Sequence, residues 1–332
     1  MSGGLAPFAV SLLPPLLLLL GLWLLDSYRL LGFSRVIQAL AGGACVAILL
    51  YPLNSAGFAA FGNFYSHSGA PVVEELAKMV LPWFWIRRNQ VGFLVDAAIL
   101  GFAVGIGFSL VENVQDLGSV ADSSTLLWII RGCGTATMHG TATGCAAVLF
   151  LASELAGGGK KTMLAGVFLP IGVHLFYNSG LLEPALTAET AILLGSGLMV
   201  VVFAISERML AAWLQEDLNR NFELWLLVDQ GSSGDSDAGR YLERLIAYMD
   251  PQRIPDLLAL LRLSLELSAQ SKGELIRRRN GLPASPDMQL PVRLQELAAL
   301  EERVGLAGRR ALSPLLGTHS RTRWEKNRMR SI

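Results

Sequence analysis

Long apolar runs occupy roughly the first 200 residues of the sequence and constrain the fold more than any other feature. A helix that crosses the hydrocarbon core of a bilayer needs about 20 apolar residues. The backbone of such a segment must satisfy its own hydrogen bonds, which favours helices over other structures. We therefore predict an all-α polytopic membrane protein with about seven transmembrane helices, near residues 6–25, 36–53, 69–86, 92–114, 125–152, 162–181 and 187–206.

Charged residues divide the chain into two parts. Residues 1–206 contain 8 Lys and Arg and 10 Asp and Glu, whereas the shorter segment 207–332 contains 19 and 17. The second part also has amphipathic runs that are typical of helices in a soluble domain. We predict a transmembrane domain at 1–206 and a small helical cytoplasmic tail at 207–332, with tail helices near 241–249, 254–268 and 292–304.

The charges of the loops predict the orientation in the membrane. Basic residues occur in alternate loops, and the side that they mark is cytoplasmic by the positive-inside rule. This arrangement places the N-terminus outside and the C-terminus in the cytoplasm, and the apolar start, without a basic residue in its first seven positions, predicts that no signal peptide is removed. The basic loops contain Arg29, Arg35, Arg87, Arg88, Lys160, Lys161 and the residues from Arg208 onward, and the opposite loops contain Asn54, Asp116, Asp122 and Glu183.

Ionisable side chains lie inside four of the predicted spans, although a charge at the centre of a bilayer costs at least about 2.5 to 3.5 kcal/mol. Their positions in the spans place them at similar depths, with Glu112 shallower than the others. Because buried polar groups must satisfy one another, we expect them to converge on one site. They are Glu74, Glu75 and Lys78 in the third span, Glu112 with Asn113 in the fourth, His139 in the fifth, and His174 with Asn178 in the sixth.

These groups suit the hydrolysis of an amide, which needs an activated water, a base and donors for the developing oxyanion. In one version, His139, His174 and a carboxylate of Glu75 or Glu112 hold a zinc ion, and the other carboxylate is the base. In the other version, Glu75 activates water directly with help from His139, while His174 and Asn178 donate to the oxyanion. The residues leave both versions open, and we predict that Glu75 is the activating base.

Two other classes of function fit the same residues. The carboxylates and histidines could form the relay of a proton- or ion-coupled transporter, although the sequence has no inverted repeat of the kind that such transporters use. The chain could also be a membrane scaffold without catalysis. Basic stretches in the tail lack the aromatic residues of nucleic-acid binding motifs, so no nucleic-acid partner is predicted.

The pattern of motifs resembles the PrsW family of intramembrane proteases, which is related to the CAAX prenyl-protease and bacteriocin-processing group. The latter group typically has Arg after its paired glutamates and F-x-x-x-H in its second motif, where this chain has Lys78 and Glu112. The resemblance covers about residues 65–182. Its motifs are E-E-x-x-K at Glu74–Lys78, F-x-x-x-E-N at Phe108–Asn113, the mid-helix His139, and H-x-x-x-N at His174–Asn178.

This resemblance implies a membrane-embedded metallopeptidase of the bacterial cytoplasmic membrane. Its expected substrate is a membrane protein, such as a regulatory protein of the anti-sigma-factor kind, and its expected cofactor is zinc. Carried over by residue, the family assigns Glu74, Glu75, Glu112, His139 and His174 to the catalytic or metal site, with Lys78, Asn113 and Asn178 in support. From the chemistry of their side chains, we predict Glu112, His139 and His174 as the metal ligands.

Overall fold

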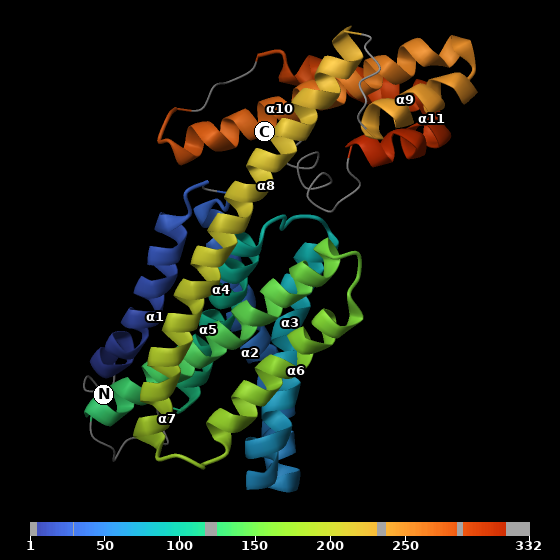
Figure 1. Ribbon diagram of the computed structural model, residues 1–332. Coiled ribbons are helices and arrows are strands. Elements are labelled where there is room, and N and C mark those ends of the chain that lie inside the picture. The colour runs from blue at the N-terminus through green and yellow to red at the C-terminus, as the bar shows by residue number, and fades with distance from the viewer. Residues whose placement is uncertain (1–4, 29, 117–124, 231–236, 284–287, 317–332) are drawn as a thin grey trace. The chain divides into compact units, whose positions relative to one another are not determined.

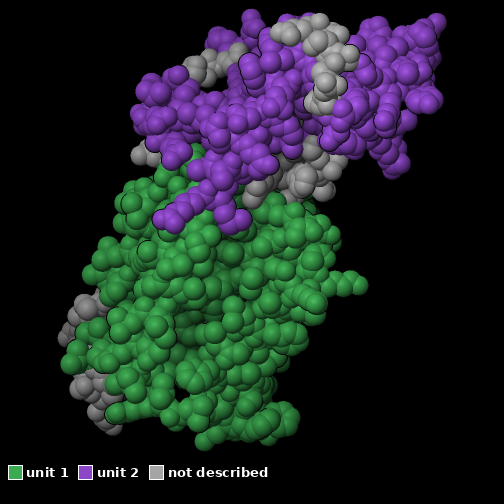
Figure 2. Space-filling view, in the orientation of Figure 1, with its two compact units in different colours: residues 1–207 green, residues 208–332 purple. Residues whose placement is uncertain are grey.

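Helices form the regular structure of the chain, and no strand occurs among the residues that the structure describes. The chain divides into two compact units, residues 1–207 and 208–332, which Figure 2 shows in green and purple. The all-α prediction is confirmed. The computed structural model describes residues 5–28, 30–116, 125–230, 237–283 and 288–316.

The first unit contains the apolar helices and the motif residues (Figure 1). Its last helix, α8, continues beyond the predicted span end at residue 206 and crosses the boundary between the units. The helical elements in order are α1 (Leu5–Leu25), α2 (Phe33–Phe61), the π-helical turn η1 (Tyr65–Gly69), α3 (Ala70–Arg87), α4 (Leu94–Asp116), α5 (Thr125–Leu155), α6 (Lys160–Asn178), α7 (Pro184–Thr190), the π-helical turn η2 (Ala191–Gly195) and α8 (Ser196–Gln230).

Three helical stretches of the described chain are long and apolar enough to cross a membrane by length and composition: Phe33–Phe61, Leu94–Gln115 and Pro184–Asp229. A shorter apolar helix covers Leu12–Leu25. Charged side chains lower the hydropathy of α3, since it carries both motif glutamates and a lysine within 18 residues. The number of seven spans therefore stays a prediction.

Helix α4 lies at the centre of the first unit, between α2 and α5. Of its apolar window 89% is buried, against 22% in Phe33–Phe61. Glycines allow this close packing, because a methyl group at Gly105 would overlap the backbone carbonyl of His139 in α5, and one at Gly107 would overlap the backbone of Leu40 in α2. The contact at Gly105 sets the distance between α4 and α5, the helices that carry the second and third motifs.

The outer face of α2 is apolar and exposed. A soluble protein rarely exposes so many large apolar side chains on one helix, whereas a helix in contact with lipid does so routinely. This face is therefore suited to the hydrocarbon core of a bilayer. It includes Ile37, Ile48, Leu49, Leu53, Phe58 and Phe61.

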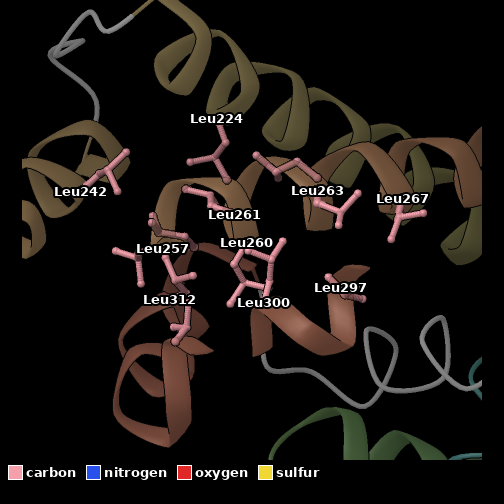
Figure 3. Packing of buried hydrophobic residues seen from close by; sticks show 13 residues of the cluster. Leu224, Leu242, Leu257, Leu260, Leu261, Leu263, Leu267, Leu297, Leu300 and Leu312 are labelled. Atoms are coloured by element: carbon pink, nitrogen blue, oxygen red, sulfur yellow. The ribbon is translucent and has the colours of Figure 1, made fainter. Parts of the chain in front are cut away.

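The second unit is a helical domain with a leucine-rich core, in which side chains of α8, α9, α10 and α11 point toward one another (Figure 3). Helix α10 has Pro in its first turn and three arginines in its last, which suit the two ends of a helix. The predicted tail helices at 254–268 and 292–304 lie within α10 and α11. The elements of this unit are the last part of α8, α9 (Asp237–Tyr248), the 3-10 turn η3 (Pro251–Arg253), α10 (Ile254–Arg279) and α11 (Leu290–Leu316).

Candidate active site

Helix α3 presents the paired glutamates and the motif lysine to the interior of the first unit. Glu74 is 6% exposed, and Glu75 and Lys78 are fully buried. Lys78 lies three residues after Glu75, on the same face of the helix. Its ammonium nitrogen contacts Glu75 Oε1 at 2.6 Å, so the pairing that the spacing allows is formed.

Lys78 also joins α3 to α4 and α5. Its Nζ lies 2.5 Å from His139 Nδ1 and 4.5 Å from the centre of the Phe108 ring. A protonated lysine can only donate, so Nδ1 of His139 is the acceptor in this contact. The neutral ring then carries its hydrogen on Nε2, which lies 2.6 Å from Glu112 Oε2 and donates to it.

Glu112 has a shallower position in its predicted span but was expected to converge with the other motif residues, and the structure brings its carboxylate into direct contact with His139. Its side chain is 26% exposed, whereas the His139 side chain is fully buried. Among the motif carboxylates, Glu112 is therefore the one most open to its surroundings. The contact depends on the close approach of α4 and α5 at Gly105.

His174 of α6 completes the cluster from the opposite side. Its Nδ1 lies 2.9 Å from Glu75 Oε1, and its Nε2 lies 3.4 Å from Asn178 Nδ2 and 3.9 Å from Glu74 Oε2. The rings of His174 and His139 meet edge to face at 4.7 Å between centres. Both histidines thus have a ring nitrogen within 3.5 Å of Glu75 Oε1.

The two oxygens of Glu75 have different surroundings. Oε1 is contacted by Lys78 and His174 and lies 3.5 Å from His139 Nδ1. Oε2 is buried and has no hydrogen-bond partner among the described residues. A buried carboxylate oxygen without a partner requires an explanation, and Oε2 is therefore a candidate reactive position.

Three of the side chains form a group that could hold a metal ion. The ligand atoms of Glu74, His139 and His174 all lie within 4.8 Å of one another, and one carboxylate with two imidazoles is a common ligand set of catalytic zinc. The sequence predicted Glu112 as the carboxylate of this set, whereas the geometry groups Glu74 with the two histidines. Both ring nitrogens of His139 are engaged, so metal binding by His139 requires that it exchanges one of its contacts.

The supporting residues occupy two different places. Asn178 lies beside His174, and its side chain also points to the backbone carbonyl of Ser66 in η1 at 3.4 Å. Asn113 donates to the backbone carbonyl of Gly132 at 3.2 Å and so ties α4 to α5. The Asn113 amide therefore stabilises the packing of α4 against α5.

The structure adds two residues that the sequence argument missed. Asn54 Nδ2 donates to Glu74 Oε1 at 2.7 Å, and Tyr65 OH donates to Asn54 Oδ1 at 3.0 Å. The placement of Asn54 in an outer loop was wrong, because α2 continues through it to Phe61. An amide within an apolar helix is itself a signal, since a polar group at that depth needs a partner.

The fold and the site define an all-helical protein with apolar helices of membrane-spanning length and a buried Glu/His cluster that could bind a metal. The model of the PrsW family intramembrane metalloprotease matches residues 30–207. This match covers more than half of the 332 residues, and the chain belongs to the PrsW family. No curated protein and no solved structure gives a match.

Proposed function

We propose that this chain is an intramembrane endopeptidase that hydrolyses a peptide bond of a membrane protein substrate. The observation that carries the proposal is the convergence of Glu74, Glu75, Glu112, His139 and His174 from α3, α4, α5 and α6 on one buried cluster. Acids, imidazoles and a fixed lysine in direct contact supply the groups that amide hydrolysis needs. Membership of a metalloprotease family supports the same reading.

The charges of the cluster suit a divalent cation. With the imidazoles neutral, three ionised carboxylates and one ammonium leave a formal charge of about −2, since three negative charges meet one positive charge. A buried excess of negative charge is costly, and a bound cation would stabilise it. Glu74, His139 and His174 would hold a zinc ion there, and a bound zinc would lower the pKa of a coordinated water and polarise a carbonyl oxygen.

Glu75 is the proposed base. Lys78 and His174 hold its Oε1, which leaves Oε2 to take the proton of the attacking water. Fixing one oxygen of the carboxylate reduces the reorganisation that the reaction requires. Asn178 lies beside His174 and is the proposed donor to the developing oxyanion.

The proposal includes the arrangement in the membrane. Seven spans, with an outside N-terminus and a cytoplasmic C-terminus, remain the arrangement that the loop charges favour. In this arrangement, the motif residues act within the bilayer on a membrane protein. The resemblance implies a regulatory protein of the anti-sigma-factor kind as one example of such a substrate. We expect the substrate to approach from the side of Glu112, the most exposed carboxylate of the cluster.

The test uses the detergent-purified full chain and a panel of single-span membrane proteins. We expect about one zinc ion per chain in the wild type. Glu75→Gln should lower the cleavage rate about 10²- to 10⁴-fold and leave the zinc bound, because it removes the base alone. His174→Ala should lose both zinc and cleavage.

The matched control is His67→Ala, which removes an exposed histidine whose Nδ1 contacts the carbonyl of Asn63. It should keep zinc and cleavage. Normal cleavage by Glu75→Gln contradicts its role as the base, and cleavage without zinc favours the metal-free version. A folded wild type that neither binds zinc nor cleaves overturns the proposal in favour of transport or scaffolding.

A further inference from the structure

A chain of hydrogen bonds reaches Glu74 from outside the four motifs. Tyr65 in η1 donates through its hydroxyl to Asn54 Oδ1 at 3.0 Å, and Asn54 in α2 donates through Nδ2 to Glu74 Oε1 at 2.7 Å. Glu74 is thereby connected to two elements that precede its own helix. Neither Asn54 nor Tyr65 touches the other motif side chains through a described hydrogen bond.

The chemistry of this chain fixes its direction. In the ionised form that binding a metal requires, the Glu74 carboxylate can only accept, which agrees with the Asn54 amide nitrogen facing Glu74 and its amide oxygen facing Tyr65. The tyrosine hydroxyl donates to that oxygen and so opposes a flip of the amide. With Oε1 of Glu74 held by Asn54, Oε2 is the oxygen that faces His174 Nε2, at 3.9 Å.

The tyrosine ring lies in a slot between two glycines. A methyl group on Gly57 of α2 would overlap the Tyr65 ring, and one on Gly69 at the end of η1 would lie 2.5 Å from a ring carbon. Only glycine leaves room for an aromatic ring at such distances. This packing is a separate observation from the hydrogen bonds. It holds the tyrosine ring where its hydroxyl reaches Asn54.

The π-helical form of η1 serves the same contact. A π-helical turn is rare and occurs frequently at functional sites, and this one ends immediately before α3, on which Glu74 lies. It places Tyr65 against α2, and it brings the backbone carbonyl of Ser66 within 3.4 Å of Asn178. The turn therefore touches both the Glu74 side and the His174 side of the cluster.

We propose that Asn54 and Tyr65 are positioning residues that orient the Glu74 carboxylate, so that its Oε2 points to His174 and into the metal group. This inference rests on the proposed function, in which Glu74 is a metal ligand. Partners that orient a ligand in this way typically change metal affinity or activity 10- to 100-fold when they are removed. Asn54 contacts the carboxylate itself, and Tyr65 acts through Asn54.

The experiment measures the zinc dissociation constant by competition with a chelator, and kcat and KM for cleavage, on the detergent-purified full chain. Asn54→Leu should raise the dissociation constant and lower kcat about 10- to 100-fold. Tyr65→Phe keeps the ring in its slot and removes only the hydroxyl. It should also raise the zinc dissociation constant and lower kcat, but by smaller factors than Asn54→Leu. KM should stay close to the wild-type value in both variants.

The matched control is Tyr51→Phe, which removes the hydroxyl of an exposed tyrosine one turn before Asn54 on α2. It should leave zinc affinity and kcat unchanged. A second comparison places Asn54→Leu in a Glu74→Gln background. If Asn54 acts through the Glu74 carboxylate, the zinc dissociation constant of the double variant should equal that of Glu74→Gln alone, whereas independent structural effects would add.

The outcomes separate this inference from the proposed function. A wild type that binds zinc and cleaves, with unchanged zinc affinity and kcat in Asn54→Leu, overturns the inference and leaves the function intact. Additive effects in the Glu74→Gln background also overturn it. A wild type that cleaves without zinc overturns the inference, because Glu74 is then not a metal ligand, and leaves the peptidase function intact. A wild type that neither binds zinc nor cleaves overturns both proposals.

Discussion

Among the residues that the structure describes, each of the two units has one fully buried lysine, and the two lysines lie in different kinds of surroundings. In the second unit, Lys272 of α10 pairs with Asp217 of α8 and donates to Ser268 Oγ at 2.5 Å. Asp217 is also paired with Arg220. The charges of this group meet partners of opposite sign and hold α10 against α8.

Lys78 of the first unit also has an acidic partner, but its surroundings hold an excess of carboxylates. Glu75 uses one oxygen for Lys78 and has a buried oxygen without a described hydrogen-bond partner, and Glu74 and Glu112 add two further acids. Burial of a charge therefore does not distinguish the two lysines. The additional carboxylates and the two imidazoles distinguish a group that could hold a cation from a structural ion pair.

The first prediction has the largest expected effect. It tests whether Lys78 has only a structural role, in which case the contrast with Lys272 would fail. Lys78→Met should destabilise the first unit, because it leaves Glu75 buried without its cation. Adding Glu75→Gln removes that charge and should recover the stability, but cleavage should stay about 10²- to 10⁴-fold below the wild type, because the base is missing. Thermal unfolding and cleavage assays on both variants check this, and a double variant that cleaves normally would refute the role of the cluster.

Several features of this cluster could be predicted from the sequence because they are local. Helical spacing alone predicts that Glu75 and Lys78 share a face, and that His174 and Asn178 do so. Apolar runs predict the helices and the motifs identify the family. These predictions depend on residues within one or two turns of each other.

Other features depend on contacts between helices and were not predictable in the same way. Glu112 meets His139 because Gly105 lets α4 approach α5. Asn54 interrupts the apolar run of the second span, yet α2 continues through it because Glu74 on another helix accepts its hydrogen bond. The choice of Glu74 over Glu112 in the metal group likewise depends on the direction of side chains. Asp122 and the side chain of Asp116, predicted in an outer loop, lie outside the described residues.

The second prediction concerns the other lysine. Lys272→Met should destabilise the second unit, but by less than the about 3–5 kcal/mol expected for a buried charge left without a partner, because Arg220 still pairs with Asp217. Cleavage by the folded protein should be unchanged, since the cluster lies wholly in the first unit. Hydrogen exchange of the α10 amides in the full chain measures the loss of stability.

A double variant sharpens this second prediction. Lys272→Met with Asp217→Leu replaces the pair by apolar side chains and should recover most of the stability. If it also lowers the cleavage rate, the ion pair of the second unit acts on the membrane site, and the contrast between the two lysines fails.

The third prediction tests the close packing that brings the site together. Gly105→Ala should lower stability by about 1–3 kcal/mol, because the added methyl group overlaps the His139 carbonyl and overpacks the contact of α4 and α5. Cleavage should fall as well, because His139 moves with its backbone. Gly172→Ala is the control, since its added methyl group meets no atom within 4 Å, and it should be as stable as the wild type or more so.

The smallest expected effect comes from an acid outside the cluster. Glu154 pairs with Arg87 at 2.9 Å, and the two side chains are 35% and 56% exposed. Exposed pairs contribute about 0–1 kcal/mol, so Glu154→Gln should change thermal stability by no more than that. Cleavage should remain at the wild-type rate, because Glu154 does not touch the motif residues. A large loss in this variant would mean that neutralising any acid of the first unit impairs the protein, and the effect of Glu75→Gln would then no longer identify Glu75 as the base.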